Sequence, residues 1–177
     1  MGRVREGKST KKGSAVQRIG LGYDVHRFAR GRKLYLGGVE VPHDQGLEGH
    51  SDADVLLHAI CDAMLGALGK GDIGEHFPNT EEQYRNIASL KLFERVLDLV
   101  RKNGYKVNNI DTVILAEAPN LKAYKKIMRQ TIAKAASLAE DAVNIKATTT
   151  EGLGAIGRKE GISAYATVLL SKEDNRQ

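Results

Sequence analysis

Two kinds of apolar spacing alternate along this chain, and their order limits the folds that it can adopt. Segments with strand character are residues 18–25, 33–36, 39–41, 107–116, 143–149 and 162–170. Segments with helical spacing are residues 51–68, 83–103 and 121–139. This order predicts an α/β (α+β) fold: a single-domain, ferredoxin-like sandwich of a mixed β-sheet with helices layered on one face. We expect the domain to span 17–173, after a basic, disordered tail at 1–16.

The charge of the chain is concentrated in that tail. The formal net charge is +5, and residues 1–17 hold five basic residues against one acidic residue. The rest is therefore nearly neutral, aromatic residues make up 5% and tryptophan is absent, which argues against a nucleic-acid partner. No apolar run has the length of a membrane span, and no secretory signal begins the chain. Cys61 stands alone inside a helical pattern, so we interpret it as a core residue in a cytoplasmic protein.

Asp24 and His26 are the first candidate metal ligands. Residues two apart on a strand point to the same face, so this carboxylate and this imidazole lie side by side. One further nitrogen would complete a three-ligand site with a position open for substrate, as in catalytic zinc centres. His58, in the first predicted helix, could supply it. On the helix pattern alone, a solvated helix face with one partly buried histidine is the commoner interpretation.

The start of that helix carries several other polar groups. Ser51 is the expected N-cap, with Asp54 three residues later as a variant of the capping box. Asp54, His58 and Asp62 are four apart and share a face, so one aspartate could hold the second nitrogen of His58. His50 precedes the helix N-terminus, which attracts anions such as phosphate. A loop histidine without a ligand is the simpler alternative.

The stretch Lys146 to Gly154 is the second unusual segment. Three threonines at a predicted strand end precede Glu151 and two glycines. Hydroxyls and backbone N–H groups suit phosphate oxygens, and Glu151 could hold a divalent cation against them. A plain strand end rich in β-branched residues is the alternative. Arg158 could bind a further anion or be a surface charge.

Taken jointly, these motifs resemble the 2-C-methyl-D-erythritol 2,4-cyclodiphosphate synthases of non-mevalonate isoprenoid biosynthesis. The resemblance runs from Arg18 to Lys172 and rests on the order and spacing of the motifs at 24–26, 50–58, 72–74 and 146–151. It implies a lyase that converts 4-diphosphocytidyl-2-C-methyl-D-erythritol 2-phosphate to the cyclic diphosphate and releases CMP. It also implies a homotrimer with active sites between subunits, with a small-molecule cytidine substrate and no membrane.

The resemblance also assigns roles to single residues. It implies one Zn²⁺ per subunit on Asp24, His26 and His58, and Mg²⁺ or Mn²⁺ on Glu151. His50 and Thr149 match the transition-state stabilisers. The residues that match substrate contacts are Ser51, Asp72, Ile73, Gly74, Phe77, Thr80, Glu81, Ala116, Ala118, Pro119, Leu121, Thr148, Thr150 and Arg158.

Two departures and two other functions stay open. Asn79-Thr80-Glu81 stands where the family often has Asp-Thr-Asp, and Ala155 stands where many members carry phenylalanine. A zinc-dependent phosphoester or diphosphate hydrolase is the alternative enzyme, although it would need a general base and no His-Glu-x-x-His motif is present. A metal-binding or nucleotide-binding module without catalysis is the third function considered.

Overall fold

The computed structural model describes residues 16–78, 80–84 and 86–172, so the expected tail up to residue 15, Asn79 and residue 173 lie outside the described residues. The strands are β1 (Gln17–Arg30), β2 (Leu34–Leu36), β3 (Val39–Val41), β4 (Gln45–Leu47), β5 (Tyr105–Leu115), β6 (Val143–Thr148) and β7 (Gly161–Lys172). The α-helices are α1 (Val55–Leu68), α2 (Ile73–His76), α3 (Ser89–Lys102), α4 (Lys125–Ala136) and α5 (Gly154–Gly157). Two 3₁₀ turns are η1 (Glu82–Tyr84) and η2 (Glu140–Ala142).

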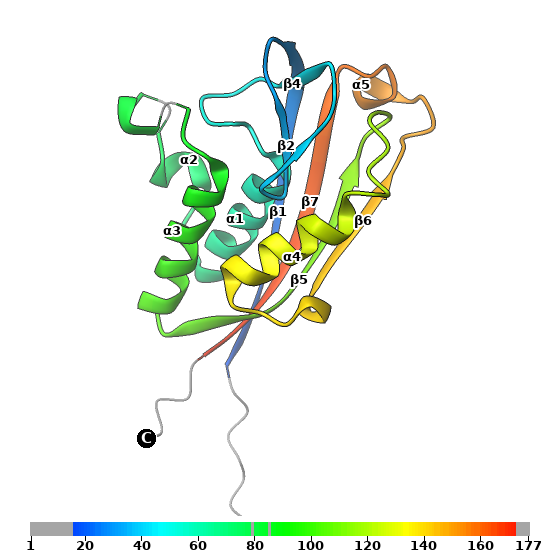
Figure 1. Cartoon of the computed structure of the whole chain (residues 1–177). Helices are drawn as coiled ribbons and strands as arrows, with labels where there is room; N and C mark the ends of the chain where they lie inside the picture. The colour runs from blue at the N-terminus through cyan, green and yellow to red at the C-terminus, as the bar shows by residue number, and fades with distance from the viewer. Residues whose placement is uncertain (1–15, 79, 85, 173–177) are drawn as a thin grey trace, which may run out of the picture.

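A mixed sheet in the order β4-β1-β7-β5-β6 forms one layer, and β2 and β3 form a separate hairpin. The β5–β6 pair is parallel, whereas the other pairs in the sheet are antiparallel. The long helices α1, α3 and α4 cover one side of this sheet (Figure 1). Helix α1 packs on β1 and on the central strand β7, whereas α3 contacts β5 and α4 contacts β6. Alternate residues of β7 are buried: Ile162, Ala164, Ala166, Val168 and Leu170. The predicted mixed sheet with helices on one face is confirmed.

Helix α1 lies unusually close to β1. A Cβ atom on Gly20 would stand 1.8 Å from the carbonyl oxygen of Ala63, and one on Gly22 would stand 1.9 Å from that of Ala59. Only glycine fits such an approach of backbone to backbone. Because side chains alternate along a strand, Asp24 and His26 face the same side as these two glycines, toward α1.

The expected start of α1 was wrong. The N-cap is Asp54, whose side chain accepts hydrogen bonds from the N–H groups of Leu56 and Leu57, and Ser51 lies in the loop before it. The same carboxylate is fully buried and also accepts from Gly37 (2.9 Å) and Gly38 (2.6 Å). Both glycines have positive φ, as a two-residue hairpin turn between β2 and β3 requires. Asp54 therefore joins the β2–β3 hairpin to the helix and is not a solvated residue.

The helix predicted over 83–103 begins only at Ser89. Asn86 has a φ of 57°, and its N–H donates to the carbonyl of His50 at 2.7 Å. The N–H of Asp52 donates in turn to the carbonyl of Ile87 at 3.1 Å. Pairing with the distant segment 50–52 thus replaces the first turns of a continuous helix. The predicted helix over 121–139 is likewise shorter, because residues 121–124 form a turn ahead of α4.

Candidate active site

Asp24, His26 and His58 meet where β1 passes the first turn of α1. Asp24 Oδ2 lies 2.9 Å from His26 Nε2 and 3.0 Å from His58 Nδ1, and the two nitrogens are 3.2 Å apart. Atoms at these separations can all lie about 2.0–2.2 Å from one ion, the usual range for zinc ligands. The predicted ligand set therefore fits a divalent metal.

The hydrogen bonds of His26 prepare it for that role. Its Nδ1 donates to the carbonyl of Glu48 at 2.6 Å, which leaves the Nε2 lone pair facing Asp24 and His58. Burial lowers the pKa of His26, but the hydrogen bond and charge of Asp24 outweigh it and raise the pKa. Burial raises the pKa of Asp24, and bonds to both histidines outweigh it and hold that pKa well below its usual range. Asp24 therefore stays ionised and available to a cation.

The second nitrogen of His58 does not contact Asp54 or Asp62, so the expected partner was wrong. His58 Nε2 lies 2.9 Å from Ser89 Oγ and 3.2 Å from Ser51 Oγ. Asp54 caps the helix, and Asp62 accepts instead from the N–H of Ile73 at 2.8 Å. The other titratable residue in this helix, Cys61, is fully buried as predicted, and burial raises its thiol pKa.

A cavity of about 210 Å³ opens above the three ligands. It brings together most of the predicted residues of this region: Asp24, His26, His50, Ser51, His58, Ile73, Gly74 and Phe77. Gly49, Tyr84 and Leu92 complete its wall and were not predicted. His50 is exposed in a loop, so its imidazole is available to a ligand in this cavity. The arrangement can hold a cation and present hydrogen-bond donors to an anion beside it.

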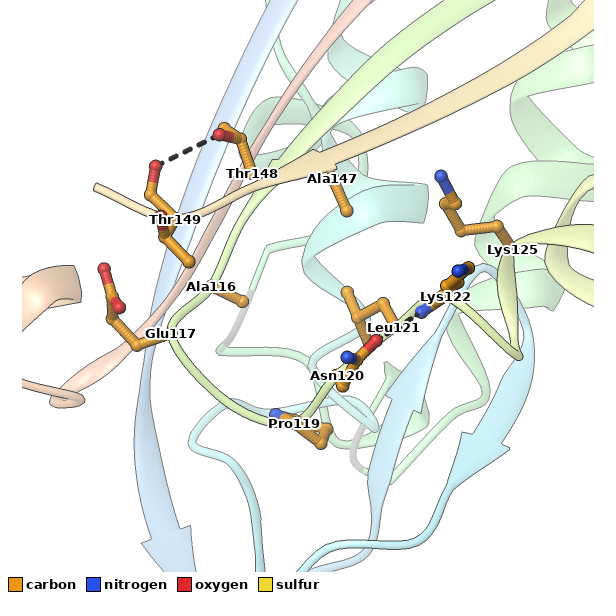
Figure 2. A pocket seen from close by; sticks show the side chains of 10 residues that line it. All are labelled: Ala116, Glu117, Pro119, Asn120, Leu121, Lys122, Lys125, Ala147, Thr148 and Thr149. Carbon is orange, nitrogen blue, oxygen red and sulfur yellow. Dashed lines mark hydrogen bonds between the residues drawn. The ribbon is translucent and has the colours of Figure 1, made fainter. Parts of the chain in front are cut away.

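A second cavity, of about 430 Å³, lies between the ends of β5 and β6 and the start of α4. It contains Ala116, Pro119, Leu121, Thr148 and Thr149 from the predicted set. Figure 2 shows Glu117 on one side of this cavity and Lys122 and Lys125 on the other. These three residues were not predicted, because isolated charged residues in a sequence carry no positional signal. The Ala118–Pro119 peptide bond here is cis.

Glu151 lies in the turn that follows β6, where the backbone is strained. Its φ is 53°, a left-handed value that glycine adopts more readily, and Gly152 follows at 78°. The Glu117 carboxylate holds this turn by accepting from the N–H groups of Thr150 (2.8 Å) and Gly152 (3.3 Å). These donors lower the pKa of Glu117. Thr149 Oγ1 donates to Glu151 at 2.7 Å, so two predicted residues meet in one exposed turn.

The remaining predicted residues lie outside the linings of the two cavities. Asp72 caps α2 by accepting from the N–H of Glu75 at 3.0 Å, and Arg158 Nε donates to Glu160 at 2.7 Å. Thr80 and Glu81 are exposed beside η1. Ala118 and Thr150 do not line the second cavity but are next in sequence to residues that do. None of the helices in the described part of the chain is long and apolar enough to cross a membrane.

Fold and site together define a small α/β enzyme with a candidate divalent-metal centre. The chain belongs to the YgbB family, whose model matches residues 17–171. It is 55% identical over 155 residues to the 2-C-methyl-D-erythritol 2,4-cyclodiphosphate synthase of Syntrophomonas wolfei, covering 88% of this chain and 99% of that protein. The Clostridioides difficile synthase is 55% identical over 153 residues, covering 86% and 95%.

Solved structures agree with this assignment. A CDP complex of the Plasmodium falciparum protein matches with a TM-score of 0.78 and 32% identity, covering 89% of this chain and 97% of that one. The bifunctional Campylobacter jejuni protein matches with a TM-score of 0.87 and 45% identity over 91% of this chain. This chain spans 44% of the length of that bifunctional protein.

Proposed function

We propose that this chain converts 4-diphosphocytidyl-2-C-methyl-D-erythritol 2-phosphate to 2-C-methyl-D-erythritol 2,4-cyclodiphosphate and releases CMP. The observation that carries the proposal is the cluster of Asp24, His26 and His58 in a cavity lined by His50. In the reaction, an oxygen of the 2-phosphate attacks the β-phosphorus. The bond from that phosphorus to the α-phosphate oxygen breaks, and CMP leaves with the electron pair. A phosphate is already ionised at neutral pH, so the attacking oxygen needs no strong base to remove a proton, and the reaction needs no protein nucleophile.

The residues then have positioning and charge-neutralising tasks. We assign zinc to Asp24, His26 and His58, where it would supply positive charge to a phosphate oxygen. Glu151 would hold Mg²⁺ or Mn²⁺, and its strained, exposed turn fits a role as a ligand. His50 and Thr149 donate to the phosphoryl oxygens on which negative charge builds up. We expect this enzyme in the cytoplasm.

The second cavity is the proposed site of the cytidine diphosphate part. Its volume of about 430 Å³ and its mixture of apolar walls and lysines suit a base with attached phosphates. The CDP complex of a relative supports a nucleotide ligand. We place Ala116, Pro119, Leu121 and Thr148 against this part, and Asp72 and Gly74 against the erythritol part. Ser51, Ile73, Phe77, Thr80, Glu81, Ala118, Thr150 and Arg158 remain proposed substrate contacts.

We further propose a homotrimer with active sites between neighbouring copies. The outer face of β1 and β7, opposite the helices, exposes a row of apolar side chains: Ile19, Leu21, Tyr23, Val25 and Tyr165. Tyr23 and Tyr165 pack together at 4.6 Å between ring centroids. A contiguous exposed apolar face of this kind marks an interface. The metal cluster and the turn of Glu151 lie at separate places on one chain. A neighbouring copy can bring its Glu151 turn to the metal cluster and so complete one active site.

A turnover assay tests this proposal. The protein, the cytidine substrate and Mg²⁺ are incubated, and the products are analysed by mass spectrometry. CMP with a cyclic diphosphate is expected; a linear product would favour the hydrolase, and no turnover would favour a binding module. His58→Ala should lose stoichiometric zinc and most activity, because two remaining ligands make a poor site. His43→Ala, whose imidazole pairs with Asp44 at 3.1 Å, is the matched control and should keep both.

A further inference from the structure

Ser89, the first residue of α3, is fully buried beside the proposed zinc ligand His58. Its hydroxyl lies 2.5 Å from Asp52 Oδ1 and 2.9 Å from His58 Nε2. Its backbone N–H donates to both oxygens of the same carboxylate, each at 3.1 Å. The three side chains thus form a continuous hydrogen-bonded line from Asp52 through Ser89 to His58.

The number of available protons fixes the direction of these hydrogen bonds. An ionised carboxylate can only accept, so the single hydroxyl proton of Ser89 points to Asp52. Ser89 Oγ then has no proton left for His58, so the 2.9 Å contact is a hydrogen bond when His58 Nε2 donates it. An imidazole with its proton on Nε2 has a free lone pair on Nδ1, the atom that lies 3.0 Å from Asp24. Ser51 Oγ lies 3.2 Å from both His58 Nε2 and Ser89 Oγ, so it can accept from Nε2 while its own proton goes to Ser89. It also receives the N–H of Ala53 at 3.0 Å.

The backbone holds this line in place from two sides. The segment 50–52 pairs with 86–87 through the two hydrogen bonds that displace the start of α3. The Arg32 guanidinium, between β1 and β2, donates to the carbonyl of Ser51 and holds the same loop from another side. The acceptors around His58 Nε2 are therefore rigid, which is what a fixed ligand orientation requires.

We propose that Asp52 and Ser89 are positioning residues that keep the proton of His58 on Nε2 and so leave Nδ1 free to bind the metal. This inference rests on the metal site of the proposed function and adds to it the two residues that set the orientation of one ligand. Partners that hydrogen-bond a metal-ligating histidine commonly change metal affinity by about 10–100-fold when removed. Because Ser51 remains as an acceptor, we expect the lower end of that range for Ser89.

Zinc affinity is the primary test. The dissociation constant for Zn²⁺ is measured by chelator competition in the wild-type protein, in Ser89→Ala and in Ser171→Ala. Ser171 is also buried, and its hydroxyl donates a hydrogen bond to Asn108 at 2.8 Å. It lies at the end of β7 that is farther from Asp24, so its variant is a matched control. We expect about tenfold weaker binding in Ser89→Ala and no change in Ser171→Ala. The melting temperatures of the metal-free variants show whether both are folded.

A spectroscopic measurement on the wild type keeps the proposal testable if Ser89→Ala does not fold. In metal-free, ¹⁵N-labelled protein, neutral His58 should already carry its proton on Nε2, and that proton should exchange more slowly than those of exposed His50. A proton on Nδ1, or unchanged zinc affinity in folded Ser89→Ala, would overturn the role of Asp52 and Ser89 while leaving the zinc site intact. Absence of stoichiometric zinc in the wild type would overturn the metal site itself, and the inference with it.

Discussion

Gly22 of β1 lies directly against Ala59 of α1, so that a Cβ atom on Gly22 would stand 1.9 Å from the Ala59 carbonyl oxygen. This approach brings the strand that carries Asp24 and His26 against the helix that carries His58. The distance between the two backbones is therefore part of the metal site, although neither Gly22 nor Ala59 offers a ligand atom.

Gly22→Ala should consequently damage both stability and metal binding. The new methyl group meets backbone atoms that cannot rotate away, so we expect a loss of about 3 kcal/mol in the free energy of unfolding and weaker zinc binding. Gly66→Ala in α1 is the matched control. Its Cβ would find the nearest heavy atom 4.0 Å away, and alanine favours a helix over glycine by about 1 kcal/mol, so this variant should be more stable. Urea denaturation measures both; equal stability of the two variants would contradict the argument.

Asp54→Asn should unfold more easily than the wild type. The buried carboxylate accepts from four backbone N–H groups, and an amide has only one oxygen to receive them. Oδ1 receives Gly37, Leu56 and Leu57, so an amide oxygen in its place keeps the cap, but the amide NH₂ would face the N–H of Gly38, donor against donor. This buried, unsatisfied contact predicts about 2 kcal/mol less stability by urea denaturation. Asp98→Asn is the control, because its ion pair with Arg101 is exposed and contributes about 0.5 kcal/mol or less. A small effect at Asp54 would show that water satisfies the freed N–H group of Gly38.

Sequence patterns predicted the elements whose periodicity is set by local contacts with the core. The alternation around Asp24 and His26, the short strands near 33–36 and 39–41 and the end of α1 at residue 68 were predicted correctly, because each depends on neighbouring residues. The predicted start of α3 was wrong because the N–H of Asn86 donates to the carbonyl of His50, 36 positions earlier in the chain. No local sequence pattern predicts that hydrogen bond.

The same limit applies to the site. The cluster of Asp24, His26 and His58 was predicted from residue types and spacing, together with the family resemblance. Ser89 was missed because a serine near a helix start has the pattern of an ordinary cap, and only the fold brings it to His58. Glu117 was missed because its partners in the turn of Glu151 lie 33 and 35 positions away.

The stabilisation that zinc gives should increase with pH. In the metal-free protein, the pKa of His26 is raised and that of Asp24 is lowered. The stability that this pair contributes is therefore fully present between the unfolded-state pKa values of 3.8 for Asp24 and 6.5 for His26. It is lost at lower pH as folded Asp24 becomes protonated, and at higher pH as folded His26 loses its proton. Zinc must displace the His26 proton, so it binds better as that proton leaves. The difference in melting temperature between zinc-loaded and metal-free protein should rise from pH 6 to pH 8. His58→Ala should show no such difference at any pH.

Leu21→Arg should dissociate the proposed trimer. Leu21 is 68% exposed on the outer face of β1, and burying a guanidinium in an apolar interface without a partner is unfavourable. Sedimentation equilibrium should show a trimer for the wild type and monomers for the variant. Ile127→Arg places the same charge at an exposed apolar residue of α4, on the helical side, and should remain trimeric. A trimer in both variants would assign the interface to another surface.

Glu117→Ala should weaken the response to magnesium without affecting zinc. Glu117 holds Thr150 and Gly152 on either side of Glu151. Without it, the turn keeps the two hydrogen bonds between Thr150 and Leu153 but loses the acceptor of the two N–H groups that flank Glu151. The concentration of Mg²⁺ that gives half-maximal activity should therefore rise. We expect a factor of about 10, which corresponds to the loss of one charge-assisted hydrogen bond. Glu117→Gln keeps one acceptor oxygen and should be intermediate. The zinc content of both variants should equal that of the wild type, because the metal cluster is built from β1 and α1. Unchanged magnesium dependence in Glu117→Ala would show that the turn keeps its conformation without the carboxylate.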